Sequence, residues 1–555
     1  MVATNLIASI FPKLAPKSQT ISWKLGLRIV QLCFGLIVWC SLSEKAKSAE
    51  KIVVNYGALE FSLSIDSLKT FADTGNIEGD LASYANFLTP EQLENLKTSL
   101  NANAEFSHLE IAQFLYSYQG ERILERASQV IKTTARQPGF YAIRSALILA
   151  AADEESGLTL LNILQKFPTD ILRVDSGEGL EIMRELSQVA QRNAMAIAAV
   201  EQQAAKESTE TATITPQIRN QELLLPGRYR YRQQQLQMND VSRGRSFPVD
   251  LYLPQTEEQQ LPLVVISHGL GSDLSTFAYF AQHLASHGFA VAVPEHPGSS
   301  SRQIAALLSG LSDDVTPPEE FIDRPLDIKF LLDRLAARFG EQIDTDNVGM
   351  IGQSFGGYTS LALAGAELNL DSLNQDCPDL AQSLNISWLL QCLGLQIPED
   401  LTKNKLQDPR ITAAIAINPL VSTVFNQEHL SQIEIPIMLV SGSADPITPA
   451  LPEQIIPFTW LQIPEKYLVL LKGGTHFSVL NESAGSVPVP QKAIGPDPKI
   501  AQDYLKQIGL AFFDKHIRQQ STADNYLNAA YGTVISQEKL PLRLIESLDP
   551  NFLSK

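Results

Sequence analysis

The sequence contains little cysteine and no apolar stretch of the length expected for a membrane-spanning helix. It has four cysteines among its 555 residues, and two of them, Cys33 and Cys40, lie within residues 1–48. The apolar run over 29–38 is about half of the roughly 20 residues that a helix needs to cross a bilayer. A second run, over 141–152, is also too short and is interrupted by Arg144. We therefore expect no stable membrane span in the mature protein.

Basic residues are also scarce relative to acidic ones. The chain carries 43 Lys and Arg against 61 Asp and Glu, a formal net charge of −18 at pH 7. A surface of this sign repels nucleic acid and anionic lipid, so we expect no nucleic-acid partner. The hydrophobic content of 44% and the charged content of 19% are typical of a globular protein.

Residues 1–48 have the pattern of a secretory signal peptide. A basic segment ending at Arg28 precedes the apolar run, and the small residues Ala46 and Ser48 follow it. This order predicts export and cleavage near Ala49, hence a periplasmic or extracellular protein. An uncleaved membrane anchor is the alternative.

The leader leaves Cys377 and Cys392 as the cysteines of the mature chain. An even pair in an exported protein favours a disulfide bond. Closing a loop of about 15 residues would stabilise the fold by roughly 3 kcal/mol in the chain-entropy model. Two buried free thiols are the alternative.

The length implies at least two domains, because a single core rarely grows to this size. We expect a mainly helical domain over 49–205, a linker over 206–222, a larger domain over 223–520 with an insertion at 367–408, and a tail over 521–555. The first domain shows no metal-ligand spacing and no phosphate-binding loop. We expect it to shape access or to dock a partner that the sequence does not identify.

Local signals in the first domain predict its opening elements. The apolar stretch 52–65 alternates in part about a glycine, which is typical of a short hairpin. Thr89 with Gln92, and Ser107 with Glu110, have the spacing of helix capping boxes.

Beyond residue 245, continuous apolar runs alternate with helical patterns. The runs cover 263–266, 289–293, 348–351, 411–417, 437–440 and 467–471. Uninterrupted apolar strands separated by helices predict a mostly parallel sheet with helices on both faces. Ligands bind such sheets beyond the carboxyl ends of the strands.

The third of these strands runs into a Gly-x-Ser-x-Gly sequence at 352–356. A small-residue helix pattern follows at 357–364. A sharp strand-to-helix turn with this sequence exposes a serine hydroxyl to an incoming base, and its glycines permit close backbone approach. We therefore predict Ser354 as a nucleophile.

An acid and a base follow two later strands. Of the histidines after Ser354, only His476 follows a strand through a Gly-Gly turn. Asp445 follows the preceding strand and completes the chain order Ser–Asp–His. Asp408 is the nearest competitor as the acid, but it precedes its strand and should lie at the opposite edge of the sheet.

The first parallel strand leads into the Gly-bracketed loop 267–272. Such a loop can aim a backbone N–H at a developing oxyanion, and the residue after the nucleophile supplies a second donor. We assign these donors to Leu270 and Phe355. His268 is better placed to orient this loop than to act as the base.

Further strand-end residues are candidates for substrate contact. These are His268, Gly269, Glu295 and His296. For the segment 294–298, a rigid turn is the alternative to a pocket wall.

These motifs together resemble those of α/β-hydrolases, in the branch of the dienelactone hydrolases and platelet-activating-factor acetylhydrolases. The resemblance covers 245–517 and is carried by 268–272, 284–289, 295–298, 324–327, 352–357 and 474–476. It implies an α/β-hydrolase fold preceded by a smaller, mainly helical domain. The N-terminal region is similar to a domain of unassigned function found ahead of such hydrolases in bacteria.

Two positions depart from the family patterns. Dienelactone hydrolases carry a cysteine nucleophile where this chain has Ser354. The acetylhydrolases take their acid from the strand after the nucleophile, where this chain has Asn418. Asp445 would then serve as the acid, at the position that is commoner in the wider fold.

We therefore predict a serine hydrolase of carboxylic esters, either lipid or short-acyl esters, which needs no cofactor or metal. A peptidase or amidase with the same triad is one alternative. A non-enzymatic binding protein on a hydrolase scaffold is another. The insertion at 367–408 is either a cap over the pocket or a surface loop held in place by a disulfide bond.

Overall fold

The computed structural model describes residues 48–56, 59–211, 222–380, 382–481 and 494–553. The predicted signal peptide lies outside these residues, apart from Ser48. Within them, no helix combines the length and the apolar character needed to span a bilayer.

The N-terminal domain contains a four-stranded sheet with the order β2-β1-β6-β4. Its strands are β1 (Lys51–Tyr56), β2 (Leu59–Ser64), β4 (Ile131–Lys132) and β6 (Ile171–Asp175), and β1 pairs antiparallel with β2. The predicted hairpin is thus confirmed. Two shorter strands, β3 (Asn103–Ala104) and β5 (Leu158–Thr159), pair with each other.

Seven helices of this domain surround a core that includes Leu68, Phe71 and Phe167. They are α2 (Ile65–Thr74), α3 (Leu81–Ala85), α4 (Pro90–Asn101), α5 (His108–Tyr116), α6 (Tyr118–Val130), α7 (Phe140–Ala151) and α8 (Leu160–Lys166). Both predicted capping boxes are present, at the starts of α4 and α5.

The larger domain is built on a nine-stranded sheet with the order β15-β14-β13-β12-β11-β9-β10-β8-β7. Its strands are β7 (Tyr231–Asp240), β8 (Arg245–Pro254), β9 (Leu261–Ser267), β10 (Ala290–Pro294), β11 (Ile343–Gln353), β12 (Ile411–Ile417), β13 (Ile437–Gly442), β14 (Lys466–Leu471) and β15 (Leu542–Ile545). Strands β9 to β14 run parallel to one another, and β7, β8 and β15 pair antiparallel with their neighbours. All six strands predicted from apolar runs are present.

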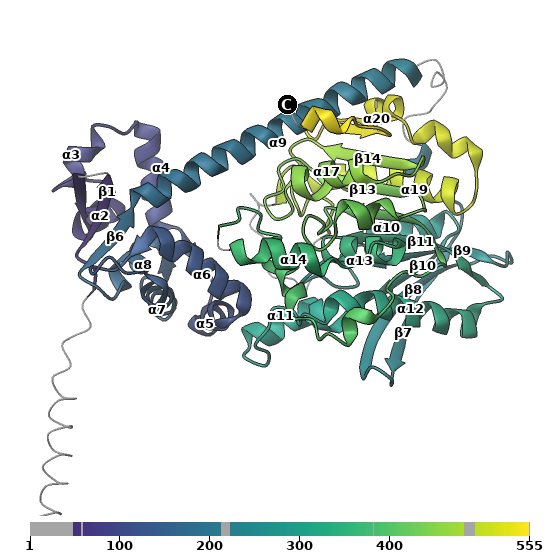
Figure 1. Ribbon diagram of the computed structural model, residues 1–555, viewed down its shortest axis with the longest axis horizontal. Coiled ribbons are helices and arrows are strands. Elements are labelled where there is room, and N and C mark those ends of the chain that lie inside the picture. Colours follow the sequence, from purple (N-terminus) through teal and green to yellow (C-terminus); the bar gives the residue numbers. More distant parts are fainter. Residues whose placement is uncertain (1–47, 57–58, 212–221, 381, 482–493, 554–555) are drawn as a thin grey trace, which may run out of the picture.

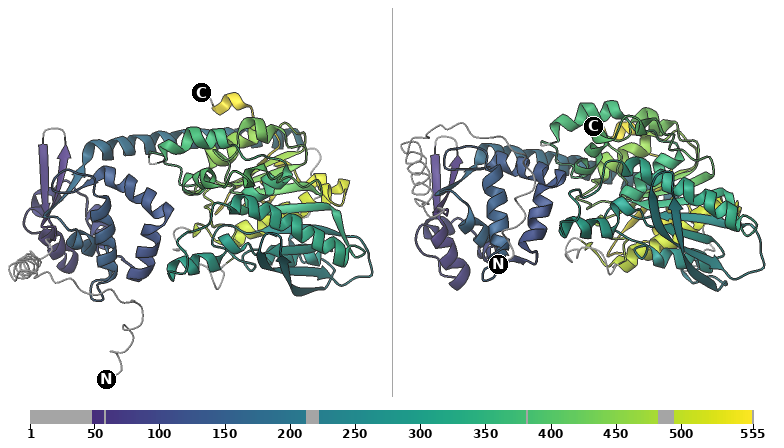
Figure 2. Two further views of the ribbon diagram at one scale, coloured as in Figure 1. Left: turned by 60° about the horizontal axis from the view of Figure 1, so that its bottom comes forward. Right: turned by 90° about the horizontal axis from the view of Figure 1, so that it is seen from below.

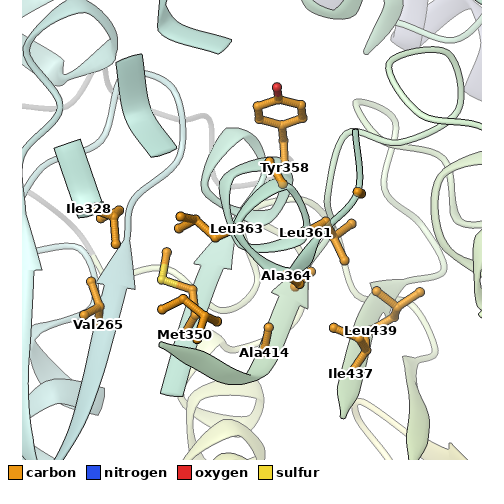
Figure 3. Packing of buried hydrophobic residues seen from close by; sticks show 14 of the residues in the cluster. Val265, Ile328, Met350, Tyr358, Leu361, Leu363, Ala364, Ala414, Ile437 and Leu439 are labelled. Atoms are coloured by element: carbon orange, nitrogen blue, oxygen red, sulfur yellow. The ribbon is translucent and has the colours of Figure 1, made fainter. Parts of the chain in front are cut away.

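Helices cover both faces of this sheet, as its apolar strands require. On one face, α10 (Ala278–Ser286) and α19 (Pro498–His516) contribute to one apolar cluster. On the other, α12 (Glu320–Phe339), α13 (Phe355–Ala364) and α17 (Ile456–Trp460) contribute to a second. Figure 3 shows this second cluster, in which Leu361 and Leu363 of α13 lie above strand residues such as Met350. The predicted α/β-hydrolase fold is confirmed.

The long helix α9 (Ser176–Thr211) connects the two domains (Figure 1). Ala196, Ala199, Val200 and Ala204 on this helix are buried in the second apolar cluster of the larger domain. Helix α9 therefore continues past the expected boundary at 205 to Thr211, and residues 212–221 of the expected linker lie outside the described residues. The small apolar residues of this helix face the sheet domain, and polar residues beside them, such as Gln203 and Glu207, bond to Ser547 of the larger domain.

Residues 521–553 form helices and a strand, where the sequence predicted a C-terminal tail. They contain η7 (Ser521–Tyr526), α20 (Ala529–Ile535), β15 and η8 (Pro550–Leu553). Strand β15 pairs with β14 and closes one edge of the sheet. Its four residues are too few to give a recognisable apolar period.

The N-terminal domain faces the carboxyl edge of the large sheet (Figures 1 and 2). Helix α5 packs against α11 (Ser301–Leu308), which follows β10. Gln119 of α6 donates a hydrogen bond of 3.4 Å to the carbonyl of Leu389, in the insertion that follows α13. Segments that leave the strand ends thus contact the N-terminal helices.

Candidate active site

Ser354 occupies the tight turn between β11 and α13. Its backbone has φ 57° and ψ −117°, a conformation that L-residues rarely adopt and that costs energy to maintain. The flanking glycines are sterically required. A Cβ on Gly352 would lie 2.0 Å from the carbonyl oxygen of Gly356, and a Cβ on Gly356 would lie 2.0 Å from that of Ser267. The geometry is that of a nucleophile elbow.

Asp445 and His476 meet beyond the ends of the neighbouring strands β13 and β14. The Asp445 carboxylate lies 2.7 Å from Nδ1 of His476, and both residues are buried. Because a carboxylate only accepts, Nδ1 carries the proton and Nε2 keeps a lone pair. Gln353 donates a hydrogen bond of 3.2 Å to the His476 carbonyl, so the histidine loop adjoins the residue before Ser354.

The Asp445 carboxylate is held by its own loop. Its Oδ1 accepts from the backbone N–H groups of Ile447 at 2.7 Å and Thr448 at 2.9 Å. The Thr448 hydroxyl lies 2.7 Å from Oδ2. Sequence analysis missed Thr448, although a threonine three residues after an aspartate in a turn is a familiar local partner.

Asn418 joins the two loops instead of supplying an acid. Its side-chain oxygen accepts from Gly442 N–H at 2.9 Å, and its amide donates to the Thr475 carbonyl at 3.3 Å. Asp408 lies at the amino end of β12, where it pairs with Arg410 at 2.6 Å. It is at the opposite edge of the sheet, as expected.

The loop after β9 lies beside the nucleophile. A Cβ on Gly269 would be 3.3 Å from Cβ of Ser354. Leu270 therefore follows a segment in close contact with Ser354, and Phe355 is the first residue of α13. Backbone N–H groups at a helix N-terminus have no partner within the helix and favour negative charge. This arrangement can accommodate an oxyanion.

The rings of His268 and His296 are engaged elsewhere. His268 Nδ1 lies 2.7 Å from the Gly269 carbonyl, and its Nε2 accepts from the His296 N–H at 3.0 Å. His296 contacts Asp327 Oδ2 at 3.1 Å and the Ser267 hydroxyl at 3.0 Å. Both rings are buried and bonded to protein groups, and their contact with substrate stays a prediction.

The same burial, together with the charge of Arg324, holds the pKa of His268 and of His296 well below the ordinary histidine range. Both rings are therefore neutral, and their hydrogen bonds orient the loop after β9. This is the role that the sequence favoured for His268. Glu295 is also largely buried, which raises its pKa, and its carboxylate lies 3.3 Å from Nε of the exposed Arg302.

The insertion at 367–408 forms short helices that pack on the sheet domain. They are α14 (Leu370–Asp376), η3 (Cys377–Asp379), α15 (Trp388–Gln391), η4 (Cys392–Gln396) and η5 (Leu401–Lys403). The predicted disulfide between Cys377 and Cys392 is present and joins η3 to η4.

A buried carboxylate, Glu453, fixes the insertion to the loop after β12. It accepts from the side chains of Asn385, Ser387, Gln391 and Ser422, and from the backbone N–H groups of Val421 and Ser422. Glu453 lies on η6 (Leu451–Ile455), which follows the Asp445 loop. Sequence analysis missed it, although it is an isolated charge in an apolar stretch.

Among the described residues, no group of three or more His, Cys, Asp or Glu side chains could hold a metal ion. The fold is that of an α/β-hydrolase, and Ser354, Asp445 and His476 follow the carboxyl ends of three of its parallel strands.

Comparison with known proteins agrees with this class. Residues 48–175 match a family model described as an α/β hydrolase of unknown function, and residues 246–320 match one for platelet-activating factor acetylhydrolase, isoform II. A platelet-activating factor acetylhydrolase from Canis lupus familiaris is 30% identical over 155 residues, covering 20% of this chain. The chain spans about a third (34%) of that relative's length. The resemblance to the acetylhydrolase-like branch of α/β-hydrolases is confirmed.

Proposed function

We propose that the protein is an exported serine hydrolase that cleaves carboxylic esters through an acyl-enzyme. The observation that carries this proposal is the 2.7 Å contact between Asp445 and His476, beyond the strand ends and next to the strained turn of Ser354. The similarity to acetylhydrolases supports an ester substrate. The leader pattern and the disulfide support export.

In this mechanism, Ser354 Oγ attacks the acyl carbon while Nε2 of His476 takes its proton. Asp445 holds the imidazole tautomer and stabilises the imidazolium. The N–H groups of Leu270 and Phe355 stabilise the tetrahedral oxyanion, and each such donor contributes on the order of 10²–10³ in rate. The alcohol leaves with the proton from His476, and water then releases the acid by the reverse sequence. We retain Gly269, which adjoins Ser354, and Glu295 as proposed substrate contacts.

The experiment is active-site labelling combined with a substrate series. A fluorophosphonate probe should label wild-type protein at Ser354, and Ser354→Ala should lose both labelling and turnover by several orders of magnitude. Labelling at another serine, or full activity in the variant, would refute the proposal.

p-Nitrophenyl esters of increasing acyl length, set against matched anilides, then separate esterase from amidase activity. Preferential cleavage of the anilides would make the protein a peptidase or amidase. An absence of labelling and of turnover in folded protein would favour a binding role.

A further inference from the structure

Arg324 of α12 is fully buried and contacts the segments that carry the proposed oxyanion donors. Its guanidinium donates to the hydroxyls of Ser299 at 2.6 Å, Ser267 at 3.0 Å and Thr359 at 3.1 Å, and to the carbonyl of His268. An arginine presents five N–H donors in a rigid planar fork, so these four partners fix its position closely.

The guanidinium also lies against the side chain of Phe355. Its central carbon is 4.7 Å from the ring centroid, within the range of a cation–π contact. Arg324 therefore touches both segments that carry the proposed oxyanion donors. It bonds to His268, two residues before Leu270, and it stacks on Phe355 itself.

The direct hydrogen-bond partners of Arg324 are neutral, and one of them, Ser299, donates in turn to the carboxylate of Glu320 at 2.5 Å. The nearby carboxylates pair directly with another arginine. Arg245 lies 2.8 Å from Glu320 and 2.7 Å from Asp327. Burial lowers the pKa of Arg324 to about 10, which still leaves it protonated at neutral pH. A positive charge whose direct hydrogen-bond partners are neutral thus contacts both segments that would carry the oxyanion donors.

We propose that Arg324 is a positioning residue for the oxyanion hole. It fixes the 268–270 loop relative to Phe355, and its positive charge favours negative charge on the substrate oxygen. This inference rests on the proposed function. Oriented donors and charges of this kind act on the transition state, since negative charge reaches the carbonyl oxygen only there. Loss of Arg324 should lower kcat for an ester much more than it raises KM.

Paired substrates test this role specifically. A thionoester has sulfur in place of the carbonyl oxygen, and sulfur is a weak hydrogen-bond acceptor that gains little from an oxyanion hole. The ratio of kcat/KM for an ester to that for its thionoester therefore reports on the hole. We expect Arg324→Met and Arg324→Lys to lower kcat for the ester about 10- to 100-fold, the effect of a small misplacement or of losing part of one donor, and to lower the ratio.

Arg410→Met is the matched control. Arg410 pairs with Asp408 and Asp333 at the opposite edge of the sheet, so its loss should lower the unfolding temperature and leave the ratio unchanged. If Arg324→Met does not fold, Thr359→Val and Ser299→Ala each remove one hydrogen bond to the guanidinium. They should lower the ratio in the same direction by a smaller factor.

Two outcomes would overturn the inference. An unchanged ratio in a folded Arg324 variant, or in both single-bond variants, would show that the arginine has only a structural role. Failure of the wild-type protein to cleave either substrate and to react with the fluorophosphonate would instead refute the proposed function, and this inference with it.

Discussion

Replacing Asp445 with asparagine changes one oxygen to an NH₂ group at the centre of the proposed triad. Oδ1 accepts two backbone N–H groups, from Ile447 and Thr448, so the amide oxygen of the variant must take that position. The NH₂ group then faces Nδ1 of His476 where Oδ2 stood, 2.7 Å away. Two N–H groups cannot face each other, so Nδ1 must accept and the proton must move to Nε2.

This tautomer cannot accept the proton of Ser354. The loss of the orienting carboxylate costs about 10⁴ in kcat in the best-studied triad. At about 1.4 kcal/mol per tenfold change in rate, this is about 5.5 kcal/mol of transition-state stabilisation. We expect a loss of this size in Asp445→Asn, with little change in the fold, because the two backbone hydrogen bonds to the side-chain oxygen are retained.

The assay is hydrolysis of a p-nitrophenyl ester by variants whose thermal unfolding is measured in parallel. Asp408→Asn is the matched control, since Asp408 is equally buried but pairs with Arg410 at the opposite edge. It should lose stability and keep most of its kcat, and Asn418→Ala should cost far less kcat than Asp445→Asn. Near-normal kcat in a folded Asp445→Asn protein would refute the assignment of the acid.

Two further predictions concern stability. Glu453→Gln should lower the free energy of unfolding by about 2–4 kcal/mol, because the new NH₂ group meets hydrogen-bond donors and charged hydrogen bonds of about 1.5–3 kcal/mol each are lost. Chemical denaturation measures this, and an unchanged midpoint would contradict it. A chain beginning at residue 206 should fail to fold, since it lacks Ala196 and Val200 of the main core. A soluble, cooperatively unfolding fragment that reacts with fluorophosphonate would show that α9 is dispensable.

The centre of the fold could be predicted because its strands are buried on both faces. A strand such as β12 has no polar residue except Thr412 and stands out as an apolar run. The edges could not be predicted in the same way. Strand β15 is short, and the last turns of α9, over 201–211, are mostly polar or charged, a composition that resembles a linker.

The residues of the candidate site also differ in whether the sequence alone predicts them. Ser354, Asp445 and His476 each follow a strand directly, so parallel topology alone brings them to one edge. The same signal selected His268 and His296 for substrate contact, and both rings are buried against other protein groups. Position at a strand end does not determine whether a ring faces solvent or the interior, so their contact with substrate stays a prediction. Arg324 and Glu453 depend on contacts between distant segments and have no local signature.

The N-terminal domain is mechanically connected to the proposed catalytic loops through α9. Asn193 donates to the carbonyl of Ser443 at 3.4 Å and accepts from the N–H of Leu451 at 3.2 Å, so it spans the loop that carries Asp445. Two turns further along the helix, Glu201 pairs with Lys472 at 3.0 Å, at the start of the loop that carries His476. Individual surface contacts of this kind are weak. Their effect comes from the helix itself, because its small residues are packed into the sheet domain and its other end contacts β1, β6 and α6 of the N-terminal domain. A change in the position of the N-terminal domain would therefore affect the loops that carry Asp445 and His476, because α9 contacts both.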